Sequence, residues 1–328
     1  MKERRMVNSR SIFFIAILIS LITACGTAEE ETAGDNASGS DDTSSEEDTR
    51  TVEHAMGETE IEGTPEKVVT LYQGANDTAA ALGVEPVGIV ESWTEKPIYK
   101  YLRDDLEGTE IIGEETQPNL EAIAEMDPDV IIANKTRHED IYEDLSAIAP
   151  TVMGEAVYKW EDTLNIMGQA LNMQEEADEL LASYEERIAT FQEKMGEELP
   201  IEASITNFRA DHARIFYMGF AGRVLEDAGF ERPEGHDNTD EWGIKLSSKE
   251  SIPEADAEVI FNFNSGTETE QIEETFEEWT DHPLWQELEA VENDQVHMVD
   301  EETWNAGGGV LAANLMVDDL YEIFDVEE

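Results

Sequence analysis

NLEAIAEMDPDVII, residues 119–132, is the stretch that decides the fold, because SKESIPEADAEVIF, residues 248–261, aligns with it without a gap. In the first copy, apolar residues three and four positions apart predict one buried helical face, and an Asp-Pro pair ends the helix before a buried strand. Glu121 corresponds to Glu250, and the strand residues of the two copies coincide. Unless this is a chance similarity of two common units, one helix-to-strand unit occurs twice, about half a folded body apart.

Strands and helices alternate around the first copy. Residues 67–71 and 85–90 have β-type sequences, and residues 77–82 between them predict a helix. This alternation favours a layered α/β domain with parallel strands. Residues 174–198 contain no proline and repeat apolar side chains at helical spacing, which predicts a long helix that links two α/β lobes.

The N-terminal residues predict targeting rather than a fold element. Residues 1–10 are basic, and the uncharged apolar run 11–24 is shorter than the ~20 apolar residues of a membrane-spanning helix. The sequence ITACG, residues 22–26, resembles a bacterial lipobox, in which Cys25 is lipidated and becomes the first mature residue. The alternative is an ordinary signal peptide with an accidental cysteine. Because Cys25 is the only cysteine of the chain, we expect no disulfide and no Cys-ligated metal in the mature protein.

Composition divides the rest of the chain. The stretch after Cys25 is rich in Gly, Ser, Thr, Asp and Glu and has no apolar periodicity, which is typical of a disordered tether. The predicted segments are a signal peptide (1–24), an acidic disordered tether (25–50), an N-terminal α/β lobe (51–160), a connecting helical segment (161–199) and a C-terminal α/β lobe (200–328).

The net charge of −58 comes from 78 acidic and 20 basic residues. A nucleic-acid partner is excluded, because binding of phosphates needs a basic face. The acidic residues are spread along the whole chain, which predicts a solvated surface suited to a saline or alkaline habitat.

Seven phrases, in fixed order and spacing, carry a family resemblance. They are TPEKVVTL, ALGVEPVGIV, IIGEETQPNLEAIAEMDPDVIIA, YEDLSAIAPTV, RIFYMGFAGRVLEDAGFERP, LSSKESIPEADAEVIFNF and HPLWQELEAVENDQVHMVDEETWNAGGG. From about residue 63 to residue 324, the chain resembles the substrate-binding lipoproteins of iron-siderophore ABC importers. Residues 136–152 and 207–222 resemble the branch that binds hydroxamate or citrate-hydroxamate siderophores.

The resemblance implies an α/β fold of two Rossmann-like, three-layer lobes, joined by one long helix, with the ligand cleft between them. It implies no catalysis and no intrinsic cofactor, so that iron(III) enters only as part of a bound ferric siderophore. It also implies a monomer that the lipid on Cys25 holds at the outer face of the cell membrane, in a Gram-positive bacterium. The permease subunits of an ABC importer would be its partners, and Glu121 and Glu250, one in each lobe, would dock on them. The alternative for these two glutamates is simple surface solvation.

Two clusters of cations mark the candidate cleft. Residues 134–138 and 207–214 are predicted to be loops that follow strands, and ligands of open α/β sheets lie beyond the carboxyl ends of strands. Arginine forks suit the carboxylates of an anionic siderophore, although the same arginines could pair only with nearby acids. The candidate residues are Arg137, His138, Arg209, His212 and Arg214.

Aromatic residues add a platform for the ligand. The candidates are Tyr72, Trp93, Trp242 and Trp304, of which Trp304 is favoured because a glycine run, residues 307–309, follows it. This run lacks the Lys-Ser/Thr pair of a phosphate loop. The six histidines are scattered without a pair at metal-ligand spacing, so no direct metal site is predicted.

Three other functions remain as alternatives. The same fold could bind haem, cobalamin or another metal chelate. A lipid-anchored hydrolase is disfavoured because the chain has no G-x-S-x-G motif. An adhesin or structural lipoprotein would not need paired lobes.

Overall fold

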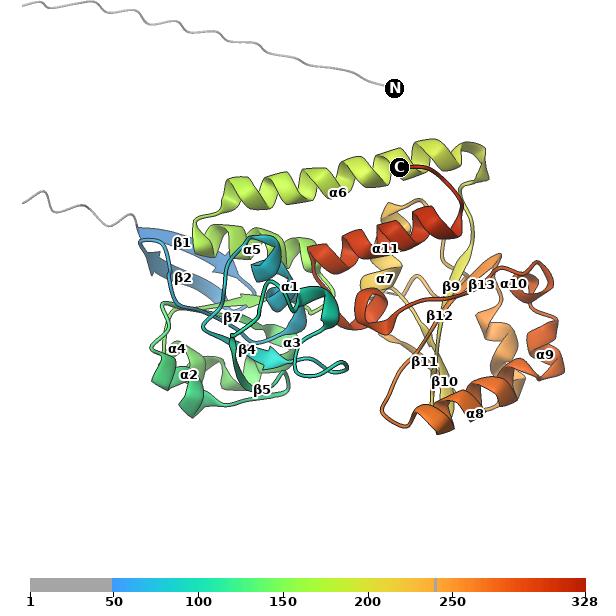
Figure 1. The fold of residues 1–328 in the computed structure, drawn as a ribbon, viewed down its shortest axis with the longest axis horizontal. Helices are drawn as coiled ribbons and strands as arrows, with labels where there is room; N and C mark the ends of the chain where they lie inside the picture. Colours follow the sequence, from blue (N-terminus) through green and yellow to red (C-terminus); the bar gives the residue numbers. More distant parts are fainter. Residues whose placement is uncertain (1–48, 239–240) are drawn as a thin grey trace, which may run out of the picture. The chain divides into compact units, whose positions relative to one another are not determined.

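Two β-sheets lie side by side in the computed structural model, which describes residues 49–238 and 241–328. A long helix crosses above both of them (Figure 1). The predicted signal peptide, Cys25 and the predicted tether up to residue 48 lie outside the described residues. Among the residues that are described, no helix is both long and apolar enough to cross a bilayer.

The N-terminal lobe is built on a six-stranded sheet of order β6-β5-β4-β3-β7-β8. All its neighbouring strands are parallel except β5 and β6, which are antiparallel. Its strands are β3 (Val68–Thr70), β4 (Gly88–Glu91), β5 (Glu110–Glu114), β6 (Gln117–Pro118), β7 (Val130–Asn134) and β8 (Thr151–Gly154).

Helices cover both faces of this sheet, because its central strands are apolar on both sides. Val68 points into the same apolar cluster as α1 and α5, whereas Val69 points into a second cluster with α2 and α4. These helices are α1 (Gln73–Ala81), α2 (Leu120–Met126), α4 (Tyr142–Ser146) and α5 (Trp160–Leu171). The three layers of the lobe therefore follow from alternation along each strand.

A short hairpin precedes this lobe. Strands β1 (Thr49–His54) and β2 (Gly57–Glu62) pair antiparallel, and the Ala55 amide donates to the Met153 carbonyl of β8. The hydroxyl of Thr59 also donates to the Thr151 carbonyl, 2.8 Å away. The hairpin thus lies along the outer strand of the sheet, an arrangement that the sequence did not predict.

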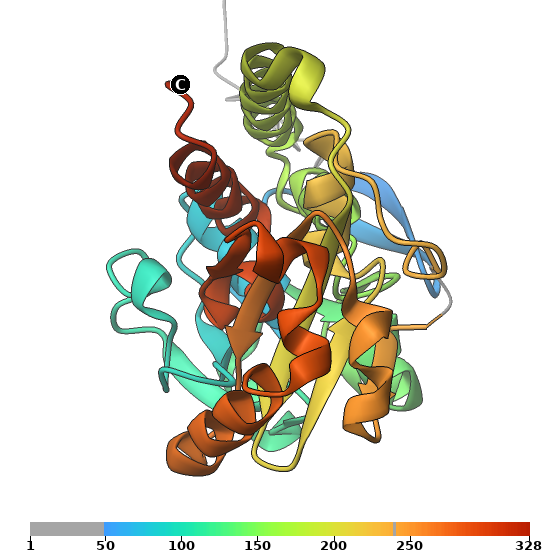
Figure 2. The same cartoon turned by 90° about the vertical axis from the view of Figure 1, so that its right-hand side faces the viewer.

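The predicted long helix is confirmed as α6 (Gln174–Met195), which follows α5 after a left-handed residue, Asn172. Its buried residues include Tyr184, Ile188 and Phe191, which recur at helical spacing. Figure 2 faces the C-terminal lobe and shows α6 and α11 (Val310–Ile323) above its sheet. Both helices belong to one apolar cluster that includes residues of both lobes.

The C-terminal lobe has a mixed five-stranded sheet of order β11-β10-β9-β12-β13. β10 is antiparallel to β9 and β11, whereas β12 is parallel to β9 and β13. Its strands are β9 (Ala203–Arg209), β10 (His212–Phe216), β11 (Gly243–Leu246), β12 (Val259–Asn264) and β13 (Val296–Met298). Its helices include α7 (Phe220–Asp227), α8 (Thr269–Thr280), α9 (Pro283–Gln286) and α10 (Glu289–Glu292).

The two copies of the repeat differ in their helices. In the first copy, the Asn119 side chain accepts hydrogen bonds from two backbone amides and caps α2, and Asp127 ends it in a left-handed conformation. The second copy forms a 3-10 helix, η4 (Lys249–Ala255), because Pro253 lies inside it and lacks an amide hydrogen. Each copy leads into a buried strand, β7 or β12, that is second from the edge of its sheet.

Candidate binding site

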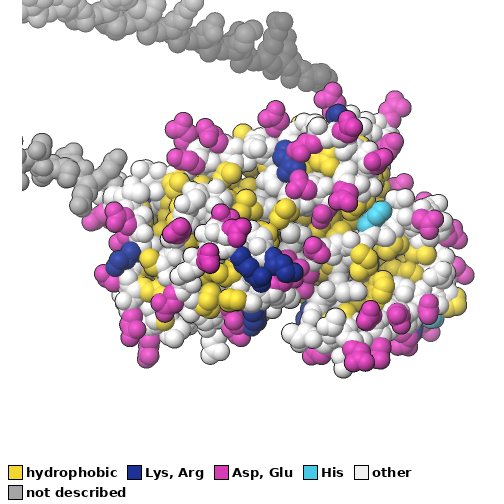
Figure 3. All heavy atoms as spheres, viewed as in Figure 1, with side chains coloured by type: hydrophobic (Ala, Val, Ile, Leu, Met, Phe, Trp, Pro, Cys, Tyr) yellow, Lys and Arg dark blue, Asp and Glu magenta, His cyan; other side chains and the backbone are white. Residues whose placement is uncertain are grey.

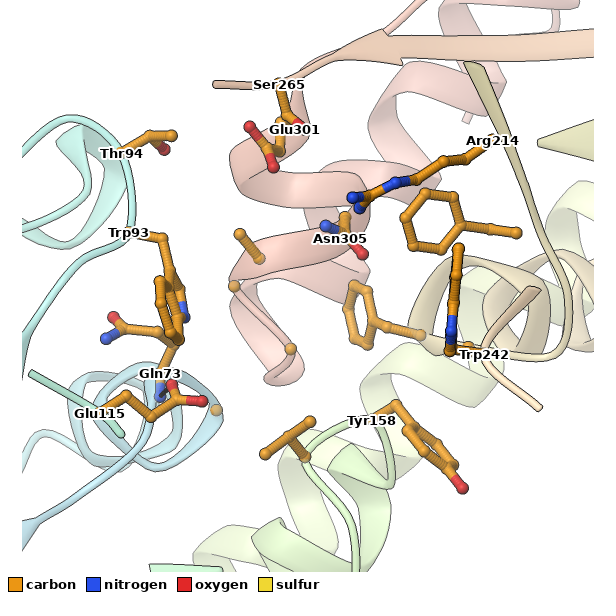
Figure 4. Close-up of a pocket in the computed structure, with 18 of the residues that line it drawn as sticks. Gln73, Trp93, Thr94, Glu115, Tyr158, Arg214, Trp242, Ser265, Glu301 and Asn305 are labelled. Atoms are coloured by element: carbon orange, nitrogen blue, oxygen red, sulfur yellow. Dashed lines mark hydrogen bonds between the residues drawn. The ribbon is translucent and has the colours of Figure 1, made fainter. Parts of the chain in front are cut away.

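A cavity of about 710 Å³ lies between the lobes (Figure 4). This volume is within the range of small-molecule sites, about 300–1,000 Å³. Both lobes line it, with residues 73–158 on one side and residues 209–308 on the other. Its polar and aromatic lining includes Gln73, Trp93, Thr94, Glu115, Arg137, Tyr158, Arg209, Arg214, Trp242, Ser265, Glu301 and Asn305.

On the N-terminal wall, Arg137 forms an ion pair with Glu115. Arg137 belongs to the short helix α3 (Lys135–His138), which begins where β7 ends. Its Nε atom donates to Glu115 Oε1 at 2.9 Å, and the Glu115 side chain is 4% exposed. The candidate residue Arg137 thus follows the carboxyl end of a parallel strand and lines the cavity.

On the C-terminal wall, strand register brings Arg209 and Arg214 to one face. Strands β9 and β10 form a hairpin in which Arg214 lies opposite Asn207. Asn207 and Arg209 share a face because alternate residues of a strand point the same way. The predicted loop 207–214 is therefore wrong: only residues 210 and 211 form a turn, and both arginines lie on strands.

Neither arginine of this wall forms an ion pair with another described residue. Arg209 donates to the Ser265 hydroxyl, and Arg214 donates through Nε to His212 Nε2 at 2.9 Å. The Arg214 guanidinium also lies over the Trp242 ring, 5.4 Å from its centroid. Burial and the nearby positive charge of Arg209 lower the pKa of Arg214. The wall therefore holds two mutually repelling cations, a condition that an anionic ligand relieves.

Three acids line the C-terminal wall: Glu241, Glu268 and Glu301. Glu301 faces the cavity close to Arg214 (Figure 4). Burial raises its pKa, whereas hydrogen bonds with Ser265 and Asn305 and the charge of Arg209 act in the opposite direction. Ser265 thus lies between Arg209 and Glu301 and contacts both side chains.

The floor of the cavity is the glycine run before α11. A Cβ atom at Gly74 would collide with the Gly308 carbonyl, and one at Gly309 would collide with the Asp77 carboxylate. Gly308 also has a φ of +69°, which favours glycine. The backbone of α1 and this run therefore approach each other as closely as glycine permits.

Asp77 fixes the start of α11 from the other lobe. Its two carboxylate oxygens accept hydrogen bonds from the amides of Leu311 and Ala312, at 2.8 and 3.0 Å, and from the Tyr101 hydroxyl at 3.0 Å. This buried carboxylate caps a helix of the C-terminal part with a residue of the N-terminal part. Burial raises the pKa of Asp77 to about 6.

Two of the four predicted aromatic residues line the cavity. Trp93 and Trp242 are 44% and 53% exposed and face the cavity from opposite sides (Figure 4). Tyr72 and Trp304 are completely buried and do not line it. Tyr72 directly precedes α1, and its hydroxyl donates to the Thr163 hydroxyl.

Trp304, the favoured aromatic residue, is turned into the core. It lies in a π-helical turn, η5 (Glu302–Ala306), and its ring packs 4.7 Å from that of Phe261. Its Nε1 atom donates to Asp319 Oδ2 at 2.7 Å. The residues after it, Asn305 to Gly308, line the cavity in its place.

The two predicted histidines contact Glu115 and Arg214, which line the cavity. His138 is buried, with Nδ1 accepting from the Asn134 amide and Nε2 donating to the Glu115 carbonyl. Burial lowers the pKa of His138, which favours this neutral form. His212 is also buried and contacts Asp211 and Arg214. Neither histidine lines the cavity.

The predicted docking residues lie elsewhere on the surface. Glu121 and Glu250 are both exposed and lie in the first turns of α2 and η4, one in each lobe. Within the described ranges, no group of three or more His, Cys, Asp or Glu side chains is placed to hold a metal ion.

Several lining residues could not be identified from the sequence. Glu115 and Glu301 are two among many acidic residues, and Ser265 is one among many serines. Only the fold distinguishes these three residues from the others. A polar residue beyond the end of β12, such as Ser265, follows the same strand-end rule that identified Arg137.

The chain is similar in sequence to known binding proteins. The sequence model described as "periplasmic binding protein" matches residues 68–303. The probable siderophore-binding lipoprotein YfiY of Bacillus subtilis is 36% identical over 98% of both chains. The achromobactin-binding periplasmic protein of Dickeya dadantii is 42% identical over 79% of this chain and 86% of its own length.

A solved structure is similar along most of the fold. It is that of SirA from Staphylococcus aureus in complex with staphyloferrin B. The TM-score is 0.81 at 45% identity, and the match covers 85% of this chain and 99% of that chain.

Proposed function

The chain belongs to the periplasmic binding protein family, and we propose that it captures an anionic ferric siderophore between its lobes. The family and the relatives named above are solute-binding proteins and not enzymes. In this proposal, the bound chelate is then delivered to an ABC importer. Iron(III) is cargo, held by the siderophore's own ligands.

The observation that carries the proposal is the meeting of three arginines at one cavity. Arg137, Arg209 and Arg214 come from both lobes of a chain whose net charge is −58. Guanidinium groups bind carboxylates through paired, charge-assisted hydrogen bonds. Trp93 and Trp242 add apolar area on opposite walls.

The relatives support the same class of ligand. One is named for achromobactin, and the similar solved structure holds staphyloferrin B. Within this class, we propose a citrate-hydroxamate or hydroxamate siderophore as the ligand, on the resemblance of residues 136–152 and 207–222 to that branch.

Native mass spectrometry with a panel of chelates tests the ligand. The panel contains ferric staphyloferrin B, ferric achromobactin, ferric schizokinen (a citrate-hydroxamate chelate), ferrichrome (a hydroxamate chelate), haem and cobalamin. We expect a one-to-one complex with an anionic ferric siderophore, which the double variant Arg137→Ala/Arg209→Ala loses. Binding of haem or cobalamin alone would contradict the proposal.

Delivery places the protein at a membrane. We propose that it is a monomer, held at the outer face of the cell membrane by a lipid on Cys25, with permease subunits as partners. Support comes from the lipobox-like sequence 22–26 and from relatives named as lipoproteins. A Cys25→Ala variant that remains lipid-modified and membrane-bound would contradict the anchor.

A further inference from the structure

Glu115 is the most deeply buried carboxylate of the cavity wall, with 3% of the residue exposed. It lies between β5 and β6 and uses all three of its oxygens. Oε1 accepts from Arg137 Nε at 2.9 Å, and Oε2 accepts from the Gln73 amide at 3.1 Å. Its backbone oxygen accepts from His138 Nε2 at 2.8 Å. Glu115 therefore connects the start of α1 to two successive residues of α3, Arg137 and His138.

Arg137 is held by one edge only. Its Nε atom is engaged, while its two terminal nitrogens have no hydrogen-bond partner among the residues that the structure describes. The side chain is 37% exposed and lines the cavity. The guanidinium is thus fixed through the nitrogen nearest the chain, and its two-nitrogen edge remains for a ligand.

The opposite wall is built differently. Arg209 is held by a neutral hydroxyl, and Arg214 by a histidine nitrogen and an indole face. No carboxylate of the described chain forms an ion pair with either of them. The charge of Arg137 is therefore balanced by a direct ion pair, whereas Arg209 and Arg214 lie on a wall that Glu241, Glu268 and Glu301 also line, without an ion pair to any of them.

We propose that Glu115 is a positioning residue for ligand recognition: it directs the free edge of Arg137 into the cavity, where Arg209 and Arg214 face it from the other wall. This inference rests on the proposed function. The proposal predicts an effect opposite to the one expected from net charge alone. Removal of the Glu115 charge weakens the binding of an anion, because the loss of a preorganised guanidinium outweighs the loss of a repulsive carboxylate.

The test is a double-mutant cycle with ferric staphyloferrin B, or with the panel chelate that binds most tightly. Glu115→Gln is expected to weaken affinity about tenfold, the effect of about one charge-assisted hydrogen bond. In an Arg137→Ala background, the same change is expected to have no further weakening effect. Glu114→Gln is the matched control, because it removes the same charge from an exposed neighbour that does not line the cavity.

Two outcomes of the cycle would overturn the proposal. Tighter or unchanged binding by Glu115→Gln would make Glu115 a simple counter-charge. An equal loss in the Arg137→Ala background would make its effect a general one on the fold, which thermal unfolding of each variant would also show.

A second measurement needs no ligand. The Nε–H proton of Arg137, assigned by its absence in Arg137→Ala, is expected to exchange slowly with water in the wild type and rapidly in Glu115→Gln. Rapid exchange in the wild type would overturn the positioning role. If no chelate binds the wild type but exchange is slow as expected, the proposed function fails and the positioning of Arg137 stands.

Discussion

At the scale of single residues, the three cavity arginines are distinguished by what holds each guanidinium. A buried carboxylate holds Arg137, a hydroxyl holds Arg209, and an imidazole and an indole hold Arg214. Each therefore presents nitrogen atoms to the cavity in a fixed direction, which lowers the conformational entropy lost on binding.

Arg209→Ala is expected to weaken siderophore binding by ~1–3 kcal/mol, the scale of a lost charge-assisted hydrogen bond. Quenching of tryptophan fluorescence measures it, because Trp93 and Trp242 line the cavity. Lys245→Ala is the control, since it removes a half-exposed cation of the same sheet that does not line the cavity. Unchanged affinity in both Arg209→Ala and Arg137→Ala, with the fold intact, would contradict a role of the cavity arginines in binding.

Asp77 predicts a pH-dependent contribution to stability. Burial raises its pKa to about 6 from 3.8, so the unfolded chain releases this proton more readily than the folded chain. The stabilisation that results is complete below about pH 3.8 and is lost as the pH rises through about 6.

Asp77→Asn tests this sign, because asparagine does not titrate. Between about pH 5 and pH 7.5, the unfolding free energy of the wild type is expected to fall by about 1–2 kcal/mol relative to that of the variant. Urea unfolding of both proteins at each pH measures the difference. A difference that stays constant with pH would show that Asp77 has an ordinary pKa.

At the scale of elements, the sequence predicted what depends on local periodicity. Alternation and helical spacing identified β3, β7 and α6, because each element has an apolar pattern of its own. The pairing of β9 with β10 was not predicted, because polar residues continue through the end of β9 and the start of β10 and resemble a loop. Strand pairing in the sheet, rather than the residues' own propensity, determines their conformation there.

Residue types that are scarce in this chain were easier to select as candidates for the site than abundant ones. Arginine is scarce in this chain, so its position after a strand carried information. Glutamate is abundant, and nothing in the sequence distinguishes Glu115 from an exposed neighbour such as Glu114. Trp304 was placed wrongly in the cavity, because its neighbouring glycines line the cavity while the π-helical turn directs its ring inward.

The floor formed by the glycine run predicts the effect of one methyl group. Gly309→Ala is expected to reduce the unfolding free energy by ~1–3 kcal/mol, because the new Cβ collides with the Asp77 carboxylate. Gly219→Ala is the control, since its methyl group would reach open space. Equal thermal stability of the two variants would contradict the close packing of α1 against the start of α11.

At the scale of the whole molecule, two lobes share one apolar cluster through α5, α6 and α11. Acidic side chains are scattered over the face shown in Figure 3. The repeat and the long linking helix predicted two lobes. The cavity could not be predicted in this way, because it depends on contacts between residues far apart in the sequence. Asp77 with Leu311 and Thr94 with Glu302 are such pairs.

The placement of Glu121 and Glu250 predicts a defect in transport without a defect in binding. A two-lobed protein can orient itself on a two-subunit permease through one acid on each lobe. Glu121→Arg with Glu250→Arg is expected to abolish siderophore uptake while leaving siderophore affinity in solution unchanged. Each single change is expected to reduce uptake less than the double change. Normal iron uptake by cells that carry the double variant would show that these residues serve only surface solvation.

The central claim, capture of an anionic ferric siderophore between the lobes, is tested most directly by locating bound iron. Crystals grown with the tightest chelate of the panel, measured at the iron absorption edge, are expected to show one anomalous peak between Arg137 and the Arg209–Arg214 wall. No anomalous peak in the cavity, or one peak at another surface, would contradict it.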